Sequence, residues 1–310
     1  MNMQRRDFLR SGLLVAGGAA AGALMPSHTG EAATAEPSGP PDAAILALTP
    51  EGDLVVKHTP GGAPSRPTSA EVRRGVPGRK WVMVIDLANC DGCGICSQTC
   101  AKSHFIPSDR QWLRVFRMQD GAEAAPYWMP RPCFHCDNPP CARVCPVGAT
   151  FKRDDGIVLI DNERCIGCRF CMAACPYSVR TFNWSRPNDP AAATARGYSP
   201  EWGYPRRVGT AEKCDFCPDM ARDGKLPHCT GACPMGAIWF GDENEDAVTN
   251  SRGETVRLSK LLRDRAAFRE LEELGTKPRV YYLPPDNRHY AAPGEAGANT
   301  GNQKTGVVQR

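Results

Sequence analysis

Apolar positions in this chain fall into short stretches that are separated by polar and turn-forming residues. The stretches "WVMVID" (residues 81–86) and "GIVLID" (residues 156–161) are rich in β-branched and other apolar residues, which predicts strands. A cysteine-rich loop follows each of them after a few residues. The chain therefore predicts a recurring order of strand, cysteine loop and helix, which belongs to an α+β fold.

A helical period marks the C-terminal part of the chain. The stretch "RLSKLLRDRAAFRELEEL" (residues 257–274) predicts a helix with Gly275 as its C-cap, and "RVYYL" (residues 279–283) predicts a short strand. We expect residues 246–290 to pack as helix and strand on the core or on a partner, and residues 291–310 to be disordered. The apolar side chains that share one helical face are Leu258, Leu261, Leu262, Ala266, Phe268 and Leu271.

The longest apolar stretch lies near the N-terminus, from Ser11 to Met25, and it is rich in alanine and glycine. Arg5-Arg6 and then Phe8-Leu9 precede it, and Ala33-Thr34-Ala35 suits a signal peptidase. These features predict a twin-arginine signal peptide over residues 1–35; an amphipathic anchor and a leader that stays uncleaved are the alternatives. The stretch is shorter than the roughly 20 residues that span a bilayer, so we expect no transmembrane helix in the mature chain.

Two further segments have the composition of connections. Residues 36–79 are rich in Pro, Gly, Ser and Ala, and they predict an extended arm, which is either a disordered linker or a wrap over a partner. Residues 186–206 predict a surface connection.

The composition argues against a large aliphatic core. The 310 residues suffice for one large domain or two small ones, and 28 prolines with 30 glycines predict many turns. A net charge of +4 is too small for this length to indicate nucleic-acid binding. Sixteen cysteines are far above ordinary usage, so that disulfides or metal sites should hold the middle of the chain together.

The cysteines form four runs, and every cysteine belongs to one of them. Run one is Cys90-x2-Cys93-x2-Cys96-x3-Cys100, and run two is Cys133-x2-Cys136-x4-Cys141-x3-Cys145. Run three is Cys165-x2-Cys168-x2-Cys171-x3-Cys175, and run four is Cys214-x2-Cys217-x11-Cys229-x3-Cys233. A proline follows runs two, three and four, whereas Ala101 follows run one.

The spacing of these runs favours iron–sulfur clusters over disulfides or zinc. Disulfides seldom join cysteines two residues apart, and zinc sites usually take two separated pairs of thiolates. Run three matches the bacterial ferredoxin pattern C-x2-C-x2-C-x3-C-P, in which three thiolates bind one [4Fe–4S] cube and the fourth reaches a neighbouring cube. Sixteen cysteines divided by four ligands predict four [4Fe–4S] clusters. Because such clusters are built in the cytoplasm, export in the folded state follows.

The runs and their flanks resemble a known family, the four-cluster iron–sulfur subunits of periplasmic molybdopterin oxidoreductases such as tetrathionate, polysulfide, dimethyl sulfoxide and arsenate reductases. The resemblance covers about residues 80–245 and is carried by "IDLANCDGCGICSQTC", "RPCFHCDNPPCARVCPVGATFKRDDGIVLIDNERCIGCRFCMAACPY" and "EKCDFCPDMARDGKLPHCTGACPMGAI". It implies two interleaved bacterial ferredoxin-like units with loop-rich insertions and a C-terminal helical tail.

The resemblance also implies which cysteines bind which cluster. Cluster 1 takes Cys90, Cys93, Cys96 and Cys233; cluster 2 takes Cys100, Cys214, Cys217 and Cys229; cluster 3 takes Cys133, Cys136, Cys141 and Cys175; cluster 4 takes Cys145, Cys165, Cys168 and Cys171.

The implied function is single-electron transfer through the clusters, between a quinol-linked, polytopic membrane subunit and a molybdopterin catalytic subunit. Cluster 1 would lie nearest the catalytic partner and cluster 4 nearest the membrane partner, in the periplasm. The same module would also suit a hydrogenase or quinone reductase complex, and a freely diffusing polyferredoxin is a third hypothesis. We predict no catalytic residues in this chain, because nothing in it resembles a nucleophile with its base or a dinucleotide fingerprint.

Single residues near the runs have two interpretations each. His135 lies between two predicted ligands and could tune a cluster, although a packing or surface role is the commoner one. Positive charges near the central runs could raise cluster potentials or face water; they are Lys152, Arg153, Arg164 and Arg169.

Overall fold

The computed structural model describes residues 44–58, 67–121, 124–185, 191–195 and 197–285. The predicted signal peptide (residues 1–35) and the predicted C-terminal tail (residues 291–310) lie outside the described residues. The chain divides into two units, Met1–Pro40 and Pro41–Arg310, and everything below concerns the second unit.

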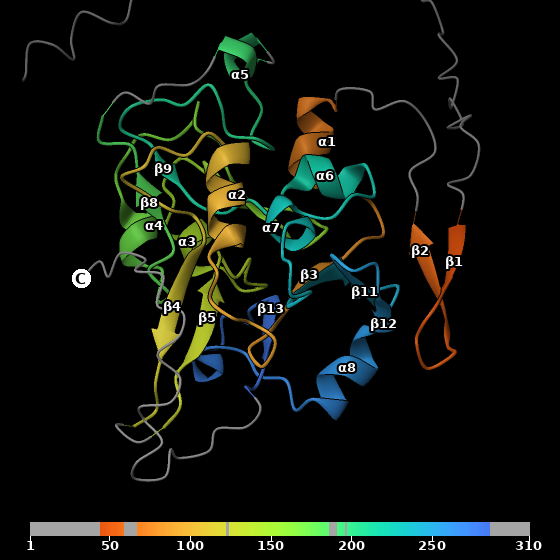
Figure 1. The fold of residues 1–310 in the computed structure, drawn as a ribbon. Helices are drawn as coiled ribbons and strands as arrows, with labels where there is room; N and C mark the ends of the chain where they lie inside the picture. Colours follow the sequence, from red (N-terminus) through yellow and green to blue (C-terminus); the bar gives the residue numbers. More distant parts are fainter. Residues whose placement is uncertain (1–43, 59–66, 122–123, 186–190, 196, 286–310) are drawn as a thin grey trace, which may run out of the picture. The chain divides into compact units, whose positions relative to one another are not determined.

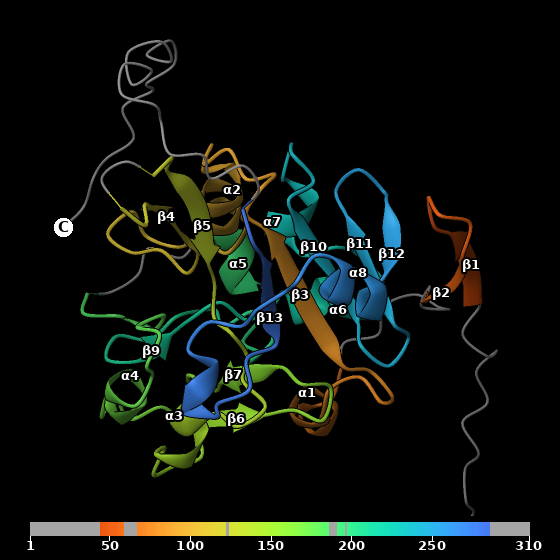
Figure 2. The same cartoon turned by 90° about the horizontal axis from the view of Figure 1, so that it is seen from below.

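A five-stranded sheet lies at the centre of the fold (Figures 1 and 2), in the order β12-β11-β10-β3-β13. Neighbouring strands run antiparallel except for β13, which pairs parallel with β3 through Val280 opposite Met83. The strands are β3 (Trp81–Asp86), β10 (Ile238–Asp242), β11 (Ala247–Asn250), β12 (Thr255–Arg257) and β13 (Val280–Leu283). The predicted strands at residues 81–86 and 279–283 are thus confirmed.

Strand β3 is buried along its whole length because both of its faces are covered. Alternate side chains of a strand point to opposite faces. Trp81, Met83 and Ile85 belong to the large core that contains buried cysteines of all the runs but run three. Val82 and Val84 belong to a second core, which α8 (Leu258–Asp264) covers through Leu258.

Four two-stranded antiparallel pairs surround the sheet. They are β1 (Ala44–Leu48) with β2 (Leu54–His58), β4 (Arg114–Met118) with β5 (Tyr127–Arg131), β6 (Thr150–Lys152) with β7 (Val158–Ile160), and β8 (Thr181–Phe182) with β9 (Ala211–Glu212). Strand β7 confirms the strand predicted at residues 156–161, in a shorter form.

The helices are short, as the glycine and proline content predicts. They are α1 (Ser69–Arg74), α2 (Ile95–Ser103), α3 (Pro140–Arg143), α4 (Phe170–Ala173), α5 (Ala191–Ala195), α6 (Pro218–Arg222), α7 (His228–Gly231) and α8. Helix α2 packs against α7, and α3 packs against α4. Within the described residues, no helix has the length and apolar character that crossing a bilayer requires.

The helix predicted over residues 257–274 is wrong in its extent. Helix α8 ends at Asp264, and only a short 3-10 helix, Glu272–Leu274, follows it. Between them, Phe268 exchanges two backbone hydrogen bonds with Tyr282 of β13, with N–O distances of 2.9 and 2.8 Å. Pairing with the sheet therefore overrides the helical period. Gly275 does end the 3-10 helix, at φ 65°, where its N–H donates to the Glu272 carbonyl.

The described part of residues 186–206 differs from a surface connection, because much of it is buried. Ser199, Glu201, Trp202, Tyr204 and Arg206 all have less than a tenth of their surface exposed.

A largely buried ion network holds this segment in place. Glu201 Oε1 accepts from Arg153 Nη1 at 2.7 Å and from Arg222 Nη2 at 2.5 Å. Arg153 Nη2 also bonds to Asp155 Oδ2 at 2.5 Å. Arg153 lies between β6 and β7, whereas Arg222 ends α6, so Glu201 joins the regions of the central and the last runs.

The described parts of the predicted arm, residues 36–79, contain regular structure. Besides the β1–β2 pair they hold α1, which begins at a capping box formed by Thr68 and Glu71. Arg73 Nη2 on this helix bonds to Asp161 Oδ2 at 2.9 Å, beyond β7. Helix α1 is thus tied to the loop that leads into run three.

Candidate iron–sulfur centre

Each cysteine run begins shortly after a strand ends. Run one follows β3, run two follows β5, run three follows β7 and run four follows β9. Each run then enters a short helix, namely α2, α3, α4 or α6, and α7 carries the second half of run four. Four strand–loop–helix units therefore present the cysteines, of which the sequence predicted the two that begin with β3 and β7.

Glycines shape two of these loops, because the backbone there adopts positive φ angles. Gly92 and Gly167 have φ values of 74° and 72°. A Cβ on Gly167 would lie 2.1 Å from the Gly209 carbonyl oxygen, and a Cβ on Gly92 would enter the Trp128 ring. The backbone N–H of Gly92 points at the Cys90 sulfur and works against the rise of the Cys90 pKa.

Two cavities, each with about 330 Å³ of empty space, collect the cysteines of the central runs. We call each set of four a sulfur group and number it as the clusters above. Group 3, Cys133, Cys136, Cys141 and Cys175, lines one cavity. Group 4, Cys145, Cys165, Cys168 and Cys171, lines the other. Each cavity thus combines three cysteines of one run with one cysteine of the other.

Cysteines of runs one and four are close enough to raise one another's pKa. Burial raises the pKa of Cys90 to about 11, and Cys233 and Cys93 add to the rise. Burial also raises the pKa of Cys96, and Cys229, Cys90 and Cys233 add to the rise. We number Cys90, Cys93, Cys96 and Cys233 as group 1, after the set that the resemblance implies for cluster 1.

Group 2 comprises Cys100, Cys214, Cys217 and Cys229, all of which are buried. Burial raises the pKa of Cys100 well above its usual value, and Cys214 and Cys229 add to the rise. Burial likewise raises the pKa of Cys217, where the Asp215 carboxylate adds more than the neighbouring thiols do.

Successive groups are neighbours. In each joining pair, burial raises the pKa of the first thiol and the second sulfur adds to that rise. The pairs are Cys96 with Cys229, Cys214 with Cys133, and Cys171 with Cys141. The four groups therefore follow one another in the order 1, 2, 3, 4.

The donor set fits iron–sulfur clusters. All sixteen cysteines lie in the described residues, and each is a free thiol rather than half of a disulfide. Closely spaced buried thiols, as in group 2, resist deprotonation, and a metal centre that they share stabilises their thiolates. Groups of four soft sulfur donors select zinc or iron–sulfur clusters, and the ferredoxin spacing of run three favours the latter.

Group 4 has different surroundings from group 2. Burial alone would raise the pKa of Cys145, but backbone N–H groups that point at its sulfur lower it below its usual value. The donors are Thr150, Val147, Ala149 and Gly148. Cys145, Cys165 and Cys168 are also partly exposed.

The sequence analysis did not identify two residues that lie beside group 2, His104 and Asp215. His104 Nε2 lies 3.3 Å from the Cys217 sulfur, and its Nδ1 lies 3.7 Å from Asp215 Oδ2. Burial raises the pKa of Asp215, and the nearby His104 works against that rise. The signal was present: Asp215 stands inside "CDFC", and His104 comes one helical turn after Cys100.

His135, which the sequence analysis singled out, is completely buried. Its Nδ1 accepts from the Val158 N–H at 3.0 Å and its Nε2 lies 3.1 Å from the Cys214 carbonyl oxygen. Burial lowers its pKa well below the usual value, so the ring is neutral and Nε2 carries the proton. The ring therefore joins the backbone of run two to β7 and run four.

The four positive charges that the sequence analysis named have different positions. Arg153 belongs to the buried ion network with Glu201, and Arg164 is exposed. Lys152 Nζ donates to the Cys136 carbonyl at 3.0 Å, at the edge of group 3. Arg169 stacks over Trp184, with 4.9 Å from its Cζ to the ring centroid.

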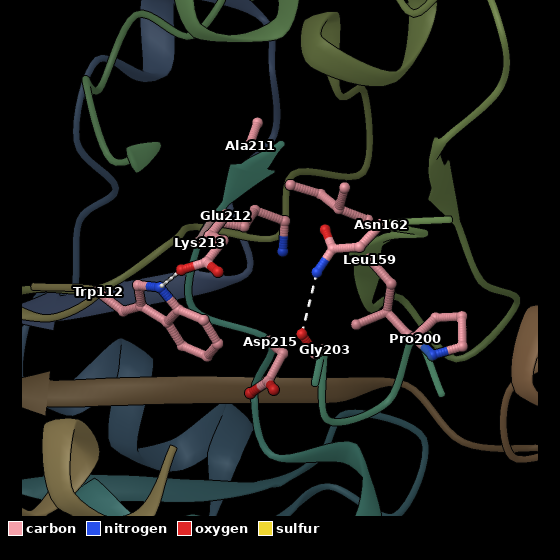
Figure 3. Close-up of a pocket in the computed structure, with 10 residues that line it drawn as sticks. Trp112, Leu159, Asn162, Pro200, Gly203, Ala211, Glu212, Lys213 and Asp215 are labelled. Carbon is pink, nitrogen blue, oxygen red and sulfur yellow. Dashed lines mark hydrogen bonds between the residues drawn. The ribbon is translucent and has the colours of Figure 1, made fainter. Parts of the chain in front are cut away.

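A polar cavity adjoins run four (Figure 3). It has about 300 Å³ of empty space, and Lys213 and Asp215 are among its lining residues. Two of its polar side chains bond within it: Trp112 Nε1 donates to Glu212 Oε2 at 3.3 Å, and Asn162 Nδ2 donates to the Gly203 carbonyl at 3.0 Å. Asn162 Oδ1 and Asp215 Oδ2 are buried without a hydrogen-bond partner among the described residues.

Exposed apolar side chains gather in the segments around group 4. Val147 and Ile166 line its cavity, and Phe170 begins α4 directly after Cys168 and Arg169. The exposed residues are Val144, Val147, Ile166, Phe170, Trp184 and Val208. Apolar residues of this size in one region are typical of a surface that contacts another protein.

Comparison with known proteins agrees with this chemistry. Two models of 4Fe–4S dicluster domains match the chain, one at residues 124–189 and the other at residues 164–237. They define the class of protein: a carrier of ferredoxin-like 4Fe–4S domains.

Several characterised proteins are similar over most of their length. A selenate reductase subunit of Mesobacillus selenatarsenatis is 37% identical over 217 residues, which are 66% of this chain and 72% of that protein. A tetrathionate reductase subunit of Salmonella typhimurium is 37% identical over 222 residues, 70% of this chain and 77% of that protein. The iron–sulfur cluster-binding subunit of the menaquinone reductase of Nitratidesulfovibrio vulgaris is 40% identical over 235 residues, 66% of this chain and 88% of that protein.

The chain therefore belongs to the family of ferredoxin-type iron–sulfur subunits that includes these reductase subunits. The resemblance inferred from the cysteine runs is confirmed.

Proposed function

We propose that this protein is an electron-transfer subunit, which relays single electrons through [4Fe–4S] clusters between two other subunits of a respiratory oxidoreductase. The observation that carries the proposal is the serial order of the four sulfur groups, each a neighbour of the next. A series of neighbouring redox centres suits the transfer of electrons from one end of the protein to the other better than the storage of electrons at one site.

The proposed ligands are the four sulfur groups, with one [4Fe–4S] cluster in each. The supports are the two cavities that groups 3 and 4 line and the mutual pKa effects within groups 1 and 2. The contacts of α2 with α7 and of α3 with α4 favour two interleaved ferredoxin-like units, in which runs one and four form one unit and runs two and three the other. Residues 246–290 were predicted to pack as helix and strand on the core or on a partner; their described part contributes β11, β12 and β13 to the central sheet, with α8 against it.

The protein holds the clusters in position and sets their reduction potentials. When bound, the clusters supply one-electron oxidation and reduction. The cysteines position them, and the strands beneath each run fix the loops. The buried side chains around groups 2 and 3 exclude water, whereas the backbone N–H groups at Cys145 favour negative charge on that sulfur. Neighbouring charges and hydrogen bonds then set each potential.

The proposed partners are a molybdopterin-type catalytic subunit near group 1 and a polytopic, quinone-interacting membrane subunit near group 4. Exposed apolar residues around group 4, such as Ile166 and Phe170, favour a partner at that end. Cys93 at group 1 is the one exposed cysteine, which favours electron entry or exit there. The terminal substrate would belong to the catalytic partner.

We further propose that the protein is exported folded, by the twin-arginine route, and acts in the periplasm. The support is the sequence of residues 1–35, with Arg5-Arg6 ahead of an apolar stretch. Replacing both arginines with lysines should leave the protein in the cytoplasm with its iron, which fractionation and iron analysis would show. Normal export of that variant would contradict the proposal.

A quinone reductase complex is the second candidate. The similar subunit from Nitratidesulfovibrio vulgaris belongs, by its name, to a menaquinone reductase. The same series of centres would then carry electrons toward the quinone. The identity of the subunits that co-purify from native membranes distinguishes the two candidates: a molybdopterin subunit supports the first, and its consistent absence supports the second.

The central proposal is tested on the full chain, purified without oxygen. Four cubane clusters correspond to about sixteen irons per chain, with reduced-state EPR spectra that show magnetic coupling between neighbours. Stoichiometric zinc instead of iron, or spectra of one isolated cluster, would refute the proposal. A chain that holds its iron but passes no electron between a chemical reductant and co-purified partner subunits would refute the relay role alone.

A further inference from the structure

Arg180 is a buried arginine that lies beside the sulfur groups of the central runs and is not one of the proposed ligands. Arg180 lies between run three and β8, with only 5% of its surface exposed. Its side chain lines the cavity of group 3. Its guanidinium also reaches Thr150, which lines the cavity of group 4. The charge of Arg180 lowers the pKa of Cys171 in group 4, against the larger effect of burial.

The guanidinium of Arg180 has few oxygen partners. Nη1 donates to Thr150 Oγ1 at 3.3 Å, and Nη2 has no hydrogen-bond partner within ordinary distance among the described residues. In the described part of the chain no carboxylate forms an ion pair with Arg180. Buried Arg153, in contrast, is paired with both Asp155 and Glu201.

The sulfur atoms supply the missing negative charge. Burial alone would lower the pKa of Arg180, but Cys141, Cys171 and Cys133 outweigh that effect and raise it. Cys141 and Cys133 belong to group 3, and Cys171 belongs to group 4. A buried guanidinium needs a counter-charge. Arg180 lines the cavity of group 3 and bonds to Thr150 of the group 4 cavity, so the sulfur atoms of both groups are in a position to supply it.

We propose that Arg180 is a counter-cation shared by clusters 3 and 4, and that its charge raises the reduction potentials of both. The proposal rests on the ligand assignment in the proposed function. Reduction adds one negative charge to a cluster, and a fixed positive charge at short range in a poorly hydrated site favours that state. One side chain would thereby keep both centres reducible by the same donor and lessen the repulsion between electrons on adjacent centres.

The test compares three variants of the full chain with the wild type by EPR-monitored redox titration. Arg180→Gln removes the charge, Arg180→Lys keeps it, and Arg164→Gln removes a mostly exposed charge near run three as the matched control. The signals of clusters 3 and 4 are assigned beforehand with Cys136→Ser and Cys168→Ser. Iron content is measured for every variant.

In Arg180→Gln we expect both assigned midpoints to become more negative, with a change of at least tenfold in the ratio of oxidised to reduced cluster at a fixed potential. For one electron, tenfold is about 59 mV. Clusters 1 and 2 should keep their potentials, and so should all clusters in Arg180→Lys and Arg164→Gln.

Several outcomes would overturn the proposal: a shift in one cluster only, no shift, an equal shift in the Arg164→Gln control, or a Lys variant that shifts as far as the Gln variant. If Arg180→Gln does not retain its iron, Arg180→Lys decides, because retained potentials support a charge effect and altered ones refute it. The wild-type iron content and spectra test the proposed function separately, so the two failures are distinguishable.

Discussion

Sulfur groups 2 and 4 each consist of four cysteine sulfurs, but they differ in burial and in the charges around them. Every cysteine of group 2 is buried, and the Asp215 carboxylate is close enough to raise the pKa of Cys217. Three cysteines of group 4 are partly exposed, and this group has backbone N–H donors at Cys145 and the positive charge of Arg180 beside Cys171. Asp215 therefore disfavours negative charge on Cys217 in group 2, whereas the N–H donors at Cys145 and the charge of Arg180 favour it in group 4. Identical ligands can hold centres of different potential, since the protein around them sets the difference.

The largest expected effect, on iron content and Tm, comes from replacing one cysteine of group 2 or one cysteine of group 4 with serine. Cys168→Ser should remove about four irons, because a half-exposed loop can lose its cluster while the rest of the core stays packed. Cys217→Ser should remove more iron than that and lower Tm further, because it leaves a polar group in the buried core. Iron analysis and calorimetry on anaerobic samples measure both losses. Equal losses from the two variants would mean that burial does not separate the two groups.

A smaller but still large effect should follow from Glu201→Ala, which leaves Arg153 and Arg222 without their shared carboxylate. Breaking a buried ion pair from one side costs about 3–5 kcal/mol in the free energy of unfolding. Denaturant unfolding measures this cost.

Asp223→Ala is the matched control, since Asp223 pairs with Lys225 at the surface. Its cost should stay below about 1 kcal/mol. If both substitutions have the same small effect, the network does not hold the two regions of the chain together.

A moderate shift should follow at group 2 from His104→Leu, which removes the ring nitrogen 3.3 Å from the Cys217 sulfur. An N–H donated to a thiolate favours the reduced state, so the potential of this one cluster should fall. A net hydrogen bond of about 0.5–1.5 kcal/mol corresponds to roughly 20–60 mV for one electron. His104→Gln, which can still donate, should restore part of the shift in the redox titration. A rise in potential, or no rescue, would contradict the donor role.

The smallest effect on the chain itself should come from the exposed apolar residues around group 4. Phe170→Ser and Val208→Ser should change the free energy of unfolding by less than about 0.5 kcal/mol and leave the iron content unchanged. Recovery of the proposed membrane subunit in co-purification should fall, while recovery of the catalytic subunit stays constant. Loss of stability without loss of the partner would show that these side chains serve the fold.

The sequence predicted the donor atoms and the strands that carry them. Spacing identifies ligands because a cluster needs several thiolates from one short loop, and strands β3, β7 and β13 were visible as apolar runs. The grouping by cavity came from resemblance, not from spacing, because it depends on how distant runs pack.

Other features depend on contacts far apart in the chain, so no local pattern could reveal them. Phe268 leaves its helical period because Tyr282 offers a backbone partner. Glu201 lies in a segment with the composition of a loop, yet it is buried by two arginines from elsewhere. His104, Asp215 and Arg180 are ordinary residues in sequence, and only the fold brings them to sulfur.

The buried carboxylate of Glu201 also limits how this molecule can move. The loop between β6 and β7 and the end of α6 both bind it, so the two regions cannot separate without leaving unpaired charges away from water. Hinge motion between them is therefore costly, and we expect the spacing of the proposed clusters to stay constant while electrons pass. Control of the electron flow would then lie with the proposed partner subunits.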